Sequence, residues 1–188
     1  MPILGIIASA FRSAAGPQGA YDALATVTVP SGGAASVSFV GIPSGYKHLQ
    51  IRFIARTNRS SLLDGVYIRY NSDSSAVYTN HSLTGDGASA SASAGTSQTY
   101  STVALVAGNT ATASVFGAGV IDVLDYSSTN KNKTMRSLGG YDRNGGGYIS
   151  LYSGLYLNSN TAITSLTFGS TDGTGLLEFS QFSLFGVK

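Results

Sequence analysis

Alternation of apolar and polar side chains with a period of two residues most constrains what this chain can fold into. It is strictest in residues 48–56, where Leu49, Ile51 and Phe53 occupy alternate positions. Residues 65–70 repeat the pattern after a mainly polar connection. Successive side chains of a strand point to opposite faces, so each run is predicted to be a strand with one buried face. We therefore predict that the two runs form a two-stranded element of an antiparallel sheet.

Comparable short runs recur along the chain, separated by turns rich in glycine, asparagine, aspartate and serine. They cover residues 24–29, 35–40, 77–83, 102–107, 113–126, 134–141, 148–157, 162–168 and 176–187. No segment longer than a turn has helical spacing. These features predict an all-β fold, a single antiparallel β-sandwich of jelly-roll type. A length of 188 residues fits one domain, which we assign to residues 23–188.

One internal segment does not fit the alternating pattern. Residues 85–95, GDGASASASAG, have low complexity and no apolar face. Such a segment cannot offset the entropy of ordering by burial of its own side chains. It is predicted to be an exposed loop or to lie against a partner.

The charge content points to a surface that is shared with other subunits. Charged residues make up only 11% of the chain, against ~25% in typical soluble domains. A surface so poor in charge gives a lone monomer little colloidal protection, which favours a homo-oligomer, a dimer or a trimer. A net charge of +2 is too small to indicate a nucleic-acid partner. The absence of cysteine excludes disulfides and zinc–thiolate sites.

The chain opens with an apolar run, MPILGIIASAF, which we interpret as a docking arm for a neighbouring subunit. The arm ends in a small-residue linker, so that arm and linker together span residues 1–22. A signal peptide has a basic residue before its apolar run, and this chain has none there. The run is also shorter than the ~20 residues that cross a bilayer. A membrane partner is therefore not expected. The side chains expected to make the contact are Ile3, Leu4, Ile6, Ile7 and Phe11.

Residue patterns that carry chemistry are largely missing. The chain has two histidines, His48 and His81, and no G-x-S-x-G motif that would expose a serine nucleophile. Glu178 is the single glutamate, and no pair of carboxylates is spaced as glycoside hydrolysis needs. The loop aspartates lack the spacing of a metal-binding loop. We predict that the protein is not an enzyme and has no catalytic residue, metal or cofactor.

Two groups of side chains are candidates for contact with a partner. The first contains tyrosines near a glycine-rich turn, which fit either a glycan or protein contact or, more simply, the preference of tyrosine for sheets. They are Tyr141, Tyr148, Tyr152 and Tyr156. The second is a basic face formed by Arg52, Arg56 and Arg69, which either pairs with acidic groups of a neighbour or is simply solvated.

Several segments together resemble a family of small virion proteins of tailed bacteriophages of aquatic bacteria. They are ILGIIASA, YDALATVTV, SVSFVGIPSGYKHLQIRFIARTNRS, VIDVLDYSSTNKNKTMRSLGGYD and SLFGVK. The resemblance implies a β-sandwich structural subunit of the particle, which contacts the major capsid protein as a decoration or cement protein, or belongs to the tail. It also implies a virion location. The alternative function is a tail-associated carbohydrate-binding module that binds a host surface glycan.

Overall fold

The computed structural model describes residues 19–188, so the predicted arm residues Ile3, Leu4, Ile6, Ile7 and Phe11 lie outside the described residues. The described part contains twelve strands and no helix, which confirms the all-β prediction. The strands are β1 (Tyr21–Thr28), β2 (Ser36–Phe39), β3 (His48–Ala55), β4 (Leu63–Tyr70), β5 (Tyr78–Gly85), β6 (Ala90–Gln98), β7 (Ser101–Ala107), β8 (Gly117–Leu124), β9 (Lys133–Asp142), β10 (Gly147–Tyr156), β11 (Leu166–Ser170) and β12 (Gln181–Val187). β1 begins two residues before the predicted domain boundary at residue 23.

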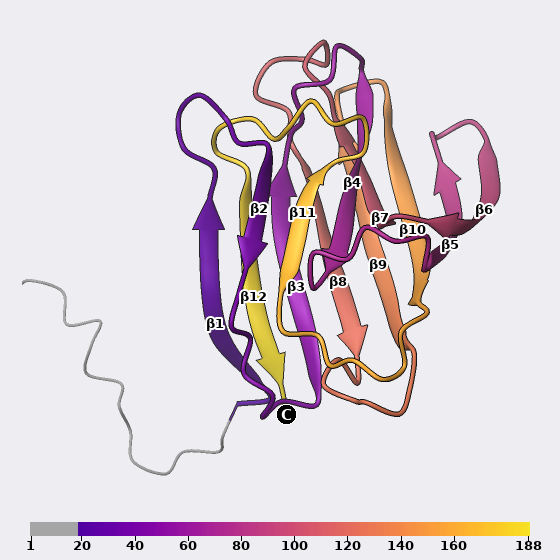
Figure 1. Ribbon diagram of the computed structural model, residues 1–188. Helices are drawn as coiled ribbons and strands as arrows, with labels where there is room; N and C mark the ends of the chain where they lie inside the picture. The colour runs from indigo at the N-terminus through magenta and orange to yellow at the C-terminus, as the bar shows by residue number, and fades with distance from the viewer. Residues whose placement is uncertain (1–18) are drawn as a thin grey trace, which may run out of the picture.

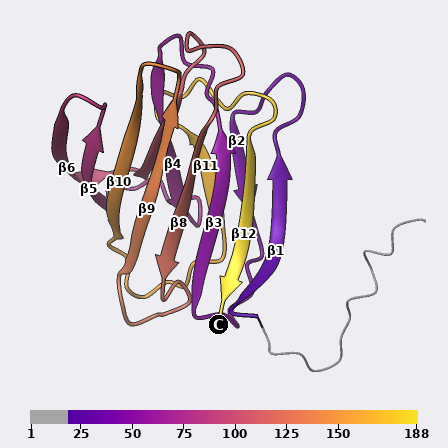
Figure 2. The ribbon, with the colours of Figure 1, turned by 180° about the vertical axis from the view of Figure 1, so that it is seen from behind.

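The strands form two sheets that face each other, so the predicted antiparallel β-sandwich is confirmed (Figure 1). The longer sheet has eight strands in the order β1-β12-β3-β8-β9-β10-β5-β6, and the shorter has four in the order β2-β11-β4-β7. Figure 2 shows the outer face of the longer sheet toward the viewer. All pairings between these strands are antiparallel.

The core lies between the two sheets and is built by the alternation read from the sequence. The longer sheet contributes Leu49 and Ile51 of β3 to this core, and the shorter sheet contributes Val66 and Ile68 of β4; all four side chains are fully buried. Aromatic rings join the layers. Phe182 of β12 stacks on Phe168 of β11 with ring centroids 5.0 Å apart, and on Phe53 of β3 at 5.6 Å.

The predicted pairing of residues 48–56 with residues 65–70 is wrong. β3 lies between β12 and β8 in the longer sheet, whereas β4 lies between β11 and β7 in the shorter one. Alternation determines which side of a strand is buried, but it does not determine which strand lies beside it. Both runs bury their apolar sides in the same core from opposite sheets, and the connection between them crosses from one sheet to the other.

Residues 85–95 are not a loop, because most of them belong to strand β6, which forms a hairpin with β5. Alternate positions carry hydroxyl groups that bond across the hairpin: Ser82 Oγ lies 2.9 Å from Ser93 Oγ, and Thr84 Oγ1 lies 2.8 Å from Ser91 Oγ. The Ser-Ala alternation thus forms a strand without burying an apolar face. Both ribbon views show the hairpin at the far edge of the longer sheet, opposite β1 (Figures 1 and 2).

Candidate functional site

The predicted tyrosine surface is not a single exposed surface, because Tyr148, Tyr152 and Tyr156 of β10 are on the side that faces the core. Tyr156 is only 1% exposed. Its ring lies 5.2 Å from that of Tyr70 and 5.0 Å from that of Tyr78, and its hydroxyl donates a 2.8 Å hydrogen bond to Asp73 Oδ2. Burial raises the pKa of Tyr156 to about 12. The tyrosine is therefore part of the core and not a partner contact.

The other three tyrosines differ from one another in their surroundings. Tyr141 of β9 and Tyr148 are opposite in register, with ring centroids 6.3 Å apart. Tyr141 is buried and donates its hydroxyl to the carbonyl oxygen of Leu62 at 3.2 Å. Tyr152 is half-buried, and burial raises its pKa. Tyr141 and Tyr148 together line a surface hollow.

That hollow is a cleft of about 780 Å³ between the β5–β6 turn and the β9–β10 turn. The two tyrosines lie on one side with Asp142, and Asp86 lies on the other. Glycines supply much of the remaining wall, and Gly145 and Gly147 hold φ angles of +99° and +152° in the β9–β10 turn. Asp86 Oδ1 accepts backbone N–H groups from Ala88 and Ser89, which fixes the carboxylate at the rim.

The three arginines do not form the predicted basic face. Arg52 lies on the outer face of the longer sheet, 5.2 Å from the centroid of the Phe185 ring. Arg69 lies on the outer face of the other sheet, 5.2 Å from the centroid of the Tyr67 ring. Arg56 is only 6% exposed. Arg56 directly follows β3, and the loop at residues 109–115 covers that end of the strand.

The Arg56 guanidinium bonds four carbonyl oxygens of the covering loop. Nη1 donates to Thr112 at 2.7 Å and Val115 at 3.1 Å, and Nη2 donates to Ala111 at 2.8 Å and Asn109 at 3.1 Å. Four charge-assisted bonds of this kind hold a segment of seven residues in one conformation. Arg56 is therefore a structural residue, whose four Nη hydrogen bonds are made within the chain.

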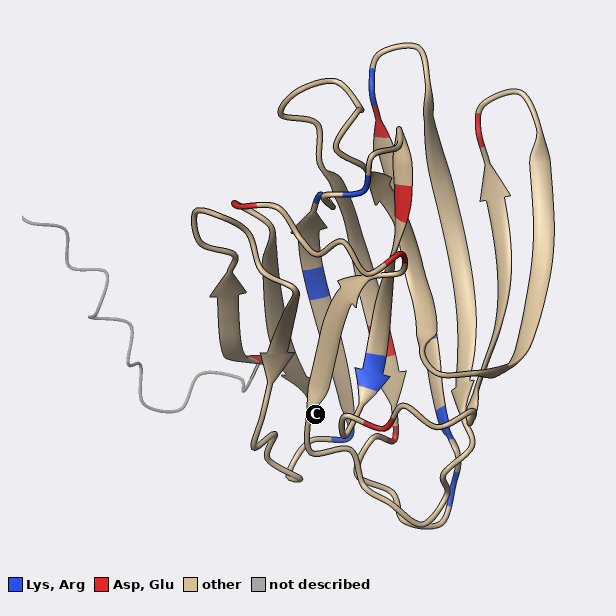
Figure 3. Ribbon diagram, turned by 45° about the horizontal axis from the view of Figure 1, so that its top comes forward, with Lys and Arg blue, Asp and Glu red and all other residues tan. Residues whose placement is uncertain are grey.

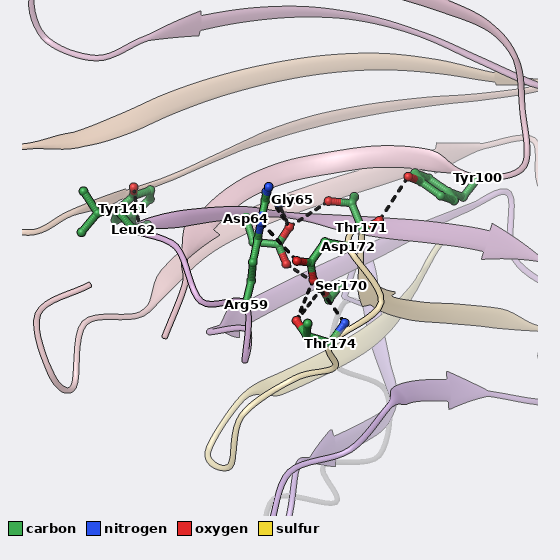
Figure 4. Close-up of polar contacts among 10 residues, drawn as sticks. All are labelled: Arg59, Leu62, Asp64, Gly65, Tyr100, Tyr141, Ser170, Thr171, Asp172 and Thr174. Carbon is green, nitrogen blue, oxygen red and sulfur yellow. Dashed lines mark hydrogen bonds and ion pairs between the residues drawn. The ribbon is translucent and has the colours of Figure 1, made fainter. Parts of the chain in front are cut away.

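A second buried polar cluster joins β4 to the turn after β11 (Figure 4). The carboxylate of Asp64, which is fully buried, accepts hydrogen bonds from Ser170 Oγ at 2.5 Å, Thr171 Oγ1 at 2.9 Å and the Gly65 backbone N–H at 2.7 Å. Arg59 lies 3.6 Å from this carboxylate and 3.2 Å from that of Asp172. Because donors of the chain itself satisfy the buried carboxylate, the cluster holds two strands of the shorter sheet together.

The most unusual surface is an apolar band on the outer face of the longer sheet. Among residues 19–188, half of the ten exposed large hydrophobic side chains lie in it, with 45–66% of each exposed: Ile54, Leu83, Leu138, Ile149 and Leu151. Leu83, Leu151 and Leu138 are directly opposite one another on β5, β10 and β9, and Val120 of β8 continues the row. A parallel row contains Ile54, Ala118, Gly140 and Ile149. We call these two rows the apolar band.

The apolar band is hollowed where glycines lie in it. A depression of about 520 Å³ is bounded by Leu138, Ile149 and Val120, with Arg52 at one end. At Gly140, between Ala118 and Ile149, an added Cβ would lie 2.3 Å from the carbonyl oxygen of Tyr148, so no side chain fits there. Glycine at this position therefore keeps the depression open.

Polar side chains border the band on one side, and the band itself carries no charge apart from Arg52 at its end. Asp122 and Arg136 are opposite in register in the row below, and Gln50 Nε2 donates to Asp122 Oδ1 at 3.0 Å. Figure 3 shows that most charged residues lie near the strand ends and in the connections. An uncharged apolar area bordered by polar groups is typical of a surface that another protein covers.

Sequence reasoning missed the apolar band, although the alternation of β10 contained a signal of it. Tyr148 and Tyr152 alternate with Ile149 and Leu151, so both sides of this strand carry large side chains that favour burial. A strand of this kind within a sandwich covers the core with one side only, which leaves the other for a partner.

No arrangement of catalytic or metal-binding groups stands out among residues 19–188. This part of the chain contains no group of three or more histidine, aspartate or glutamate residues that could hold a metal ion. The Nδ1 atom of His48 accepts a 3.0 Å hydrogen bond from the Asp125 backbone N–H. Within the same residues, no helix is long and apolar enough to cross a membrane. The comparisons with known proteins found no matching family model, curated protein or solved structure.

Proposed function

We propose that this protein is a structural subunit of a tailed-phage virion, a capsid decoration or cement protein that stabilises the particle through contacts between copies of the chain. The apolar band carries the proposal. A lone monomer rarely keeps such an area in water, and the polar border fits an interface rim. The segments quoted above that resemble virion proteins point to the same role.

The strand order supports a jelly-roll interpretation, which fits a particle subunit. Without the hairpins β5–β6 and β9–β10, the sheets read β1-β12-β3-β8 and β2-β11-β4-β7. Eight strands in two sheets of this kind, made of two Greek keys, form the fold of many viral capsid domains. Fold alone does not assign function, and the same architecture occurs in lectins and enzymes. The proposal therefore depends on the surface and not on the strand order.

The size of the band sets how strong one contact between copies can be. About half of each of its five large side chains is exposed, so covering all five contributes roughly 4–7 kcal/mol. Association itself costs ~4–15 kcal/mol, so a single contact of this size is weak. Repetition over many copies on one particle converts weak contacts into a stable shell.

The test replaces the centre of the band by charge. The double variant Leu138→Lys/Leu151→Lys should fold normally, because both side chains point away from the core, and should fail to load onto particles. Ser38→Lys, on the outer face of the shorter sheet, is the matched control. Loading is measured by immunogold electron microscopy of intact particles. Normal loading of the double variant contradicts the proposal.

The N-terminal arm belongs to the same proposal. Deleting residues 2–11 removes Ile3, Leu4, Ile6, Ile7 and Phe11, whose burial on a neighbour would strengthen the assembly. We expect the truncated protein to keep its sandwich and to load poorly. A truncated protein that loads as well as the full chain would show that the arm has no part in assembly.

The cleft beside Tyr148 favours a second function, binding of a host surface glycan by a tail-associated module. An aromatic ring beside the carboxylates of Asp86 and Asp142 offers both a stacking surface and hydrogen-bond acceptors for a sugar. Glycan-array binding that disappears in Tyr148→Ala would support this function. An array without signal for the native protein would count against it.

A further inference from the structure

We propose that residues 3–11 of one copy bind the apolar band of a neighbouring copy. This inference rests on the proposed function, in which copies of the chain assemble, and it assigns the surface that receives the arm. Residues 3–11 contain no charged side chain, and four of the nine are isoleucine or leucine. The apolar band has the same chemistry.

The shape of the band favours a narrow apolar segment over the same face of a second copy. If two bands met face to face, half-exposed leucines would meet leucines, and the depression beside Gly140 would stay unfilled. Empty apolar space forfeits contacts on every wall that bounds it. A single segment can place branched side chains into the depression of about 520 Å³ and keep its other side in water, where its backbone groups stay hydrated.

The position of the first described residue favours a neighbouring copy as the donor of the segment. Gly19 precedes β1, the edge strand of the longer sheet, whereas the band centres on β9 and β10. In the β1–β12–β3 register Tyr21 is level with His48, so Gly19 is six to eight residues along the strands from the two rows of the band. With four to five strand spacings of ~4.8 Å to cross, the path is roughly 28–36 Å. The chain from Gly19 back to Phe11 covers at most ~26–29 Å when fully extended.

Such a path within one copy also meets an obstacle. Arg52 lies 5.9 Å from the centroid of the Tyr21 ring and 5.2 Å from that of the Phe185 ring on the same outer face. Tyr21 lies on β1, Phe185 on β12 and Arg52 on β3 at the near end of the band, so the three side chains cover the route from β1 to the band. A segment within one copy would therefore need a fully extended linker laid over them, whereas a segment from a neighbour has no such constraint.

The absence of cysteine makes the inference directly testable. Ile6→Cys and Leu151→Cys are prepared as two single variants of the full chain, mixed at equal concentration, and treated with a short bis-maleimide. We expect the yield of crosslinked heterodimer to be about tenfold higher than in a control mixture of Ile6→Cys with Ser38→Cys, because a docked segment raises the local concentration of the two thiols. Ser38 is exposed on the other sheet.

The double variant Ile6→Cys/Leu151→Cys separates the two donors. Crosslinked dimers and larger species support a neighbouring copy, and a product crosslinked only within one chain overturns the inference. Equal crosslinking to the Ser38→Cys control, or none to Leu151→Cys, overturns it as well. Particle loading of the Leu138→Lys/Leu151→Lys variant is scored separately, so lost loading without arm crosslinking refutes this inference and leaves the proposed function standing.

Discussion

Replacing Arg56 by methionine should destabilise the fold more than any other arginine substitution in residues 19–188. The guanidinium donates four hydrogen bonds to backbone carbonyls at 2.7–3.1 Å. Hydrogen bonds to a charged group contribute ~1.5–3 kcal/mol each, so the bonds taken singly would sum to roughly 6–12 kcal/mol. Residues 109, 110 and 112–114 are exposed, however, and their carbonyls can bond water once the loop relaxes.

We therefore expect Arg56→Met to lower the free energy of unfolding by about 3–5 kcal/mol, a large part of the ~5–15 kcal/mol of a typical domain. Arg56→Lys should lose part of this amount, because one ammonium group cannot reach four carbonyls in the plane of a guanidinium. Urea denaturation followed by circular dichroism measures both, provided that the slope with denaturant is unchanged.

Arg52→Met is the matched control for this prediction. Arg52 is exposed and contacts the Phe185 ring, an interaction that contributes ~0.5–1 kcal/mol at such sites. A loss below about 1 kcal/mol for Arg56→Met, or equal losses for the two variants, would refute the reasoning. Either result would show that Arg56 does not hold the loop in place, and contact with a partner would again be a candidate role for this residue.

Three further measurements address the stability of the fold. Stability should fall as the pH rises from 10.0 to about 12, because Tyr156 stays neutral in the folded protein while it ionises in the unfolded chain. The midpoint of urea unfolding should therefore fall less over this interval in Tyr156→Phe than in the native protein, and an equal fall in both contradicts the prediction. Asp64→Asn should lower the free energy of unfolding by about 2–4 kcal/mol, because an amide nitrogen would then face the hydroxyl donors of Ser170 and Thr171. Thermal unfolding measures the loss, and an unchanged stability would contradict the hydrogen-bond network. Gly140→Ala should cost about 1–3 kcal/mol through its contact with a backbone oxygen, whereas Gly45→Ala, with open space around it, should be close to neutral.

The sequence predicted the features that depend on local order and missed those that depend on distant segments. The alternation around Ile51 correctly identified a strand and its buried side, because side-chain direction is a property of consecutive residues. The partner of that strand could not be read in the same way. β3 pairs with β12, more than a hundred residues away, and no turn between them signals the pairing.

The candidate site shows the same division. The polar side of β3 predicted an exposed Arg56, and only the path of residues 109–115 makes it buried. One side of β10 carries Tyr148 and Tyr152, and the other carries Ile149 and Leu151. Hydropathy alone does not determine which of these two sides faces the core. Burial of the tyrosine side, which divides the predicted tyrosine surface and leaves the apolar band outside, depends on the second sheet. The docking arm stays a prediction, since residues 1–18 lie outside the described part of the chain.

The β5–β6 hairpin has a consequence for how this protein can change without losing its fold. Nearly all residues of β6 are exposed, and hydroxyl pairs rather than core contacts align it with β5. Substitutions there have little to disturb, so β6 and the turn at residues 86–89 are suited to accept inserted peptides without loss of the sandwich. Selection could remodel this edge to meet new neighbours while the sandwich behind it stays the same.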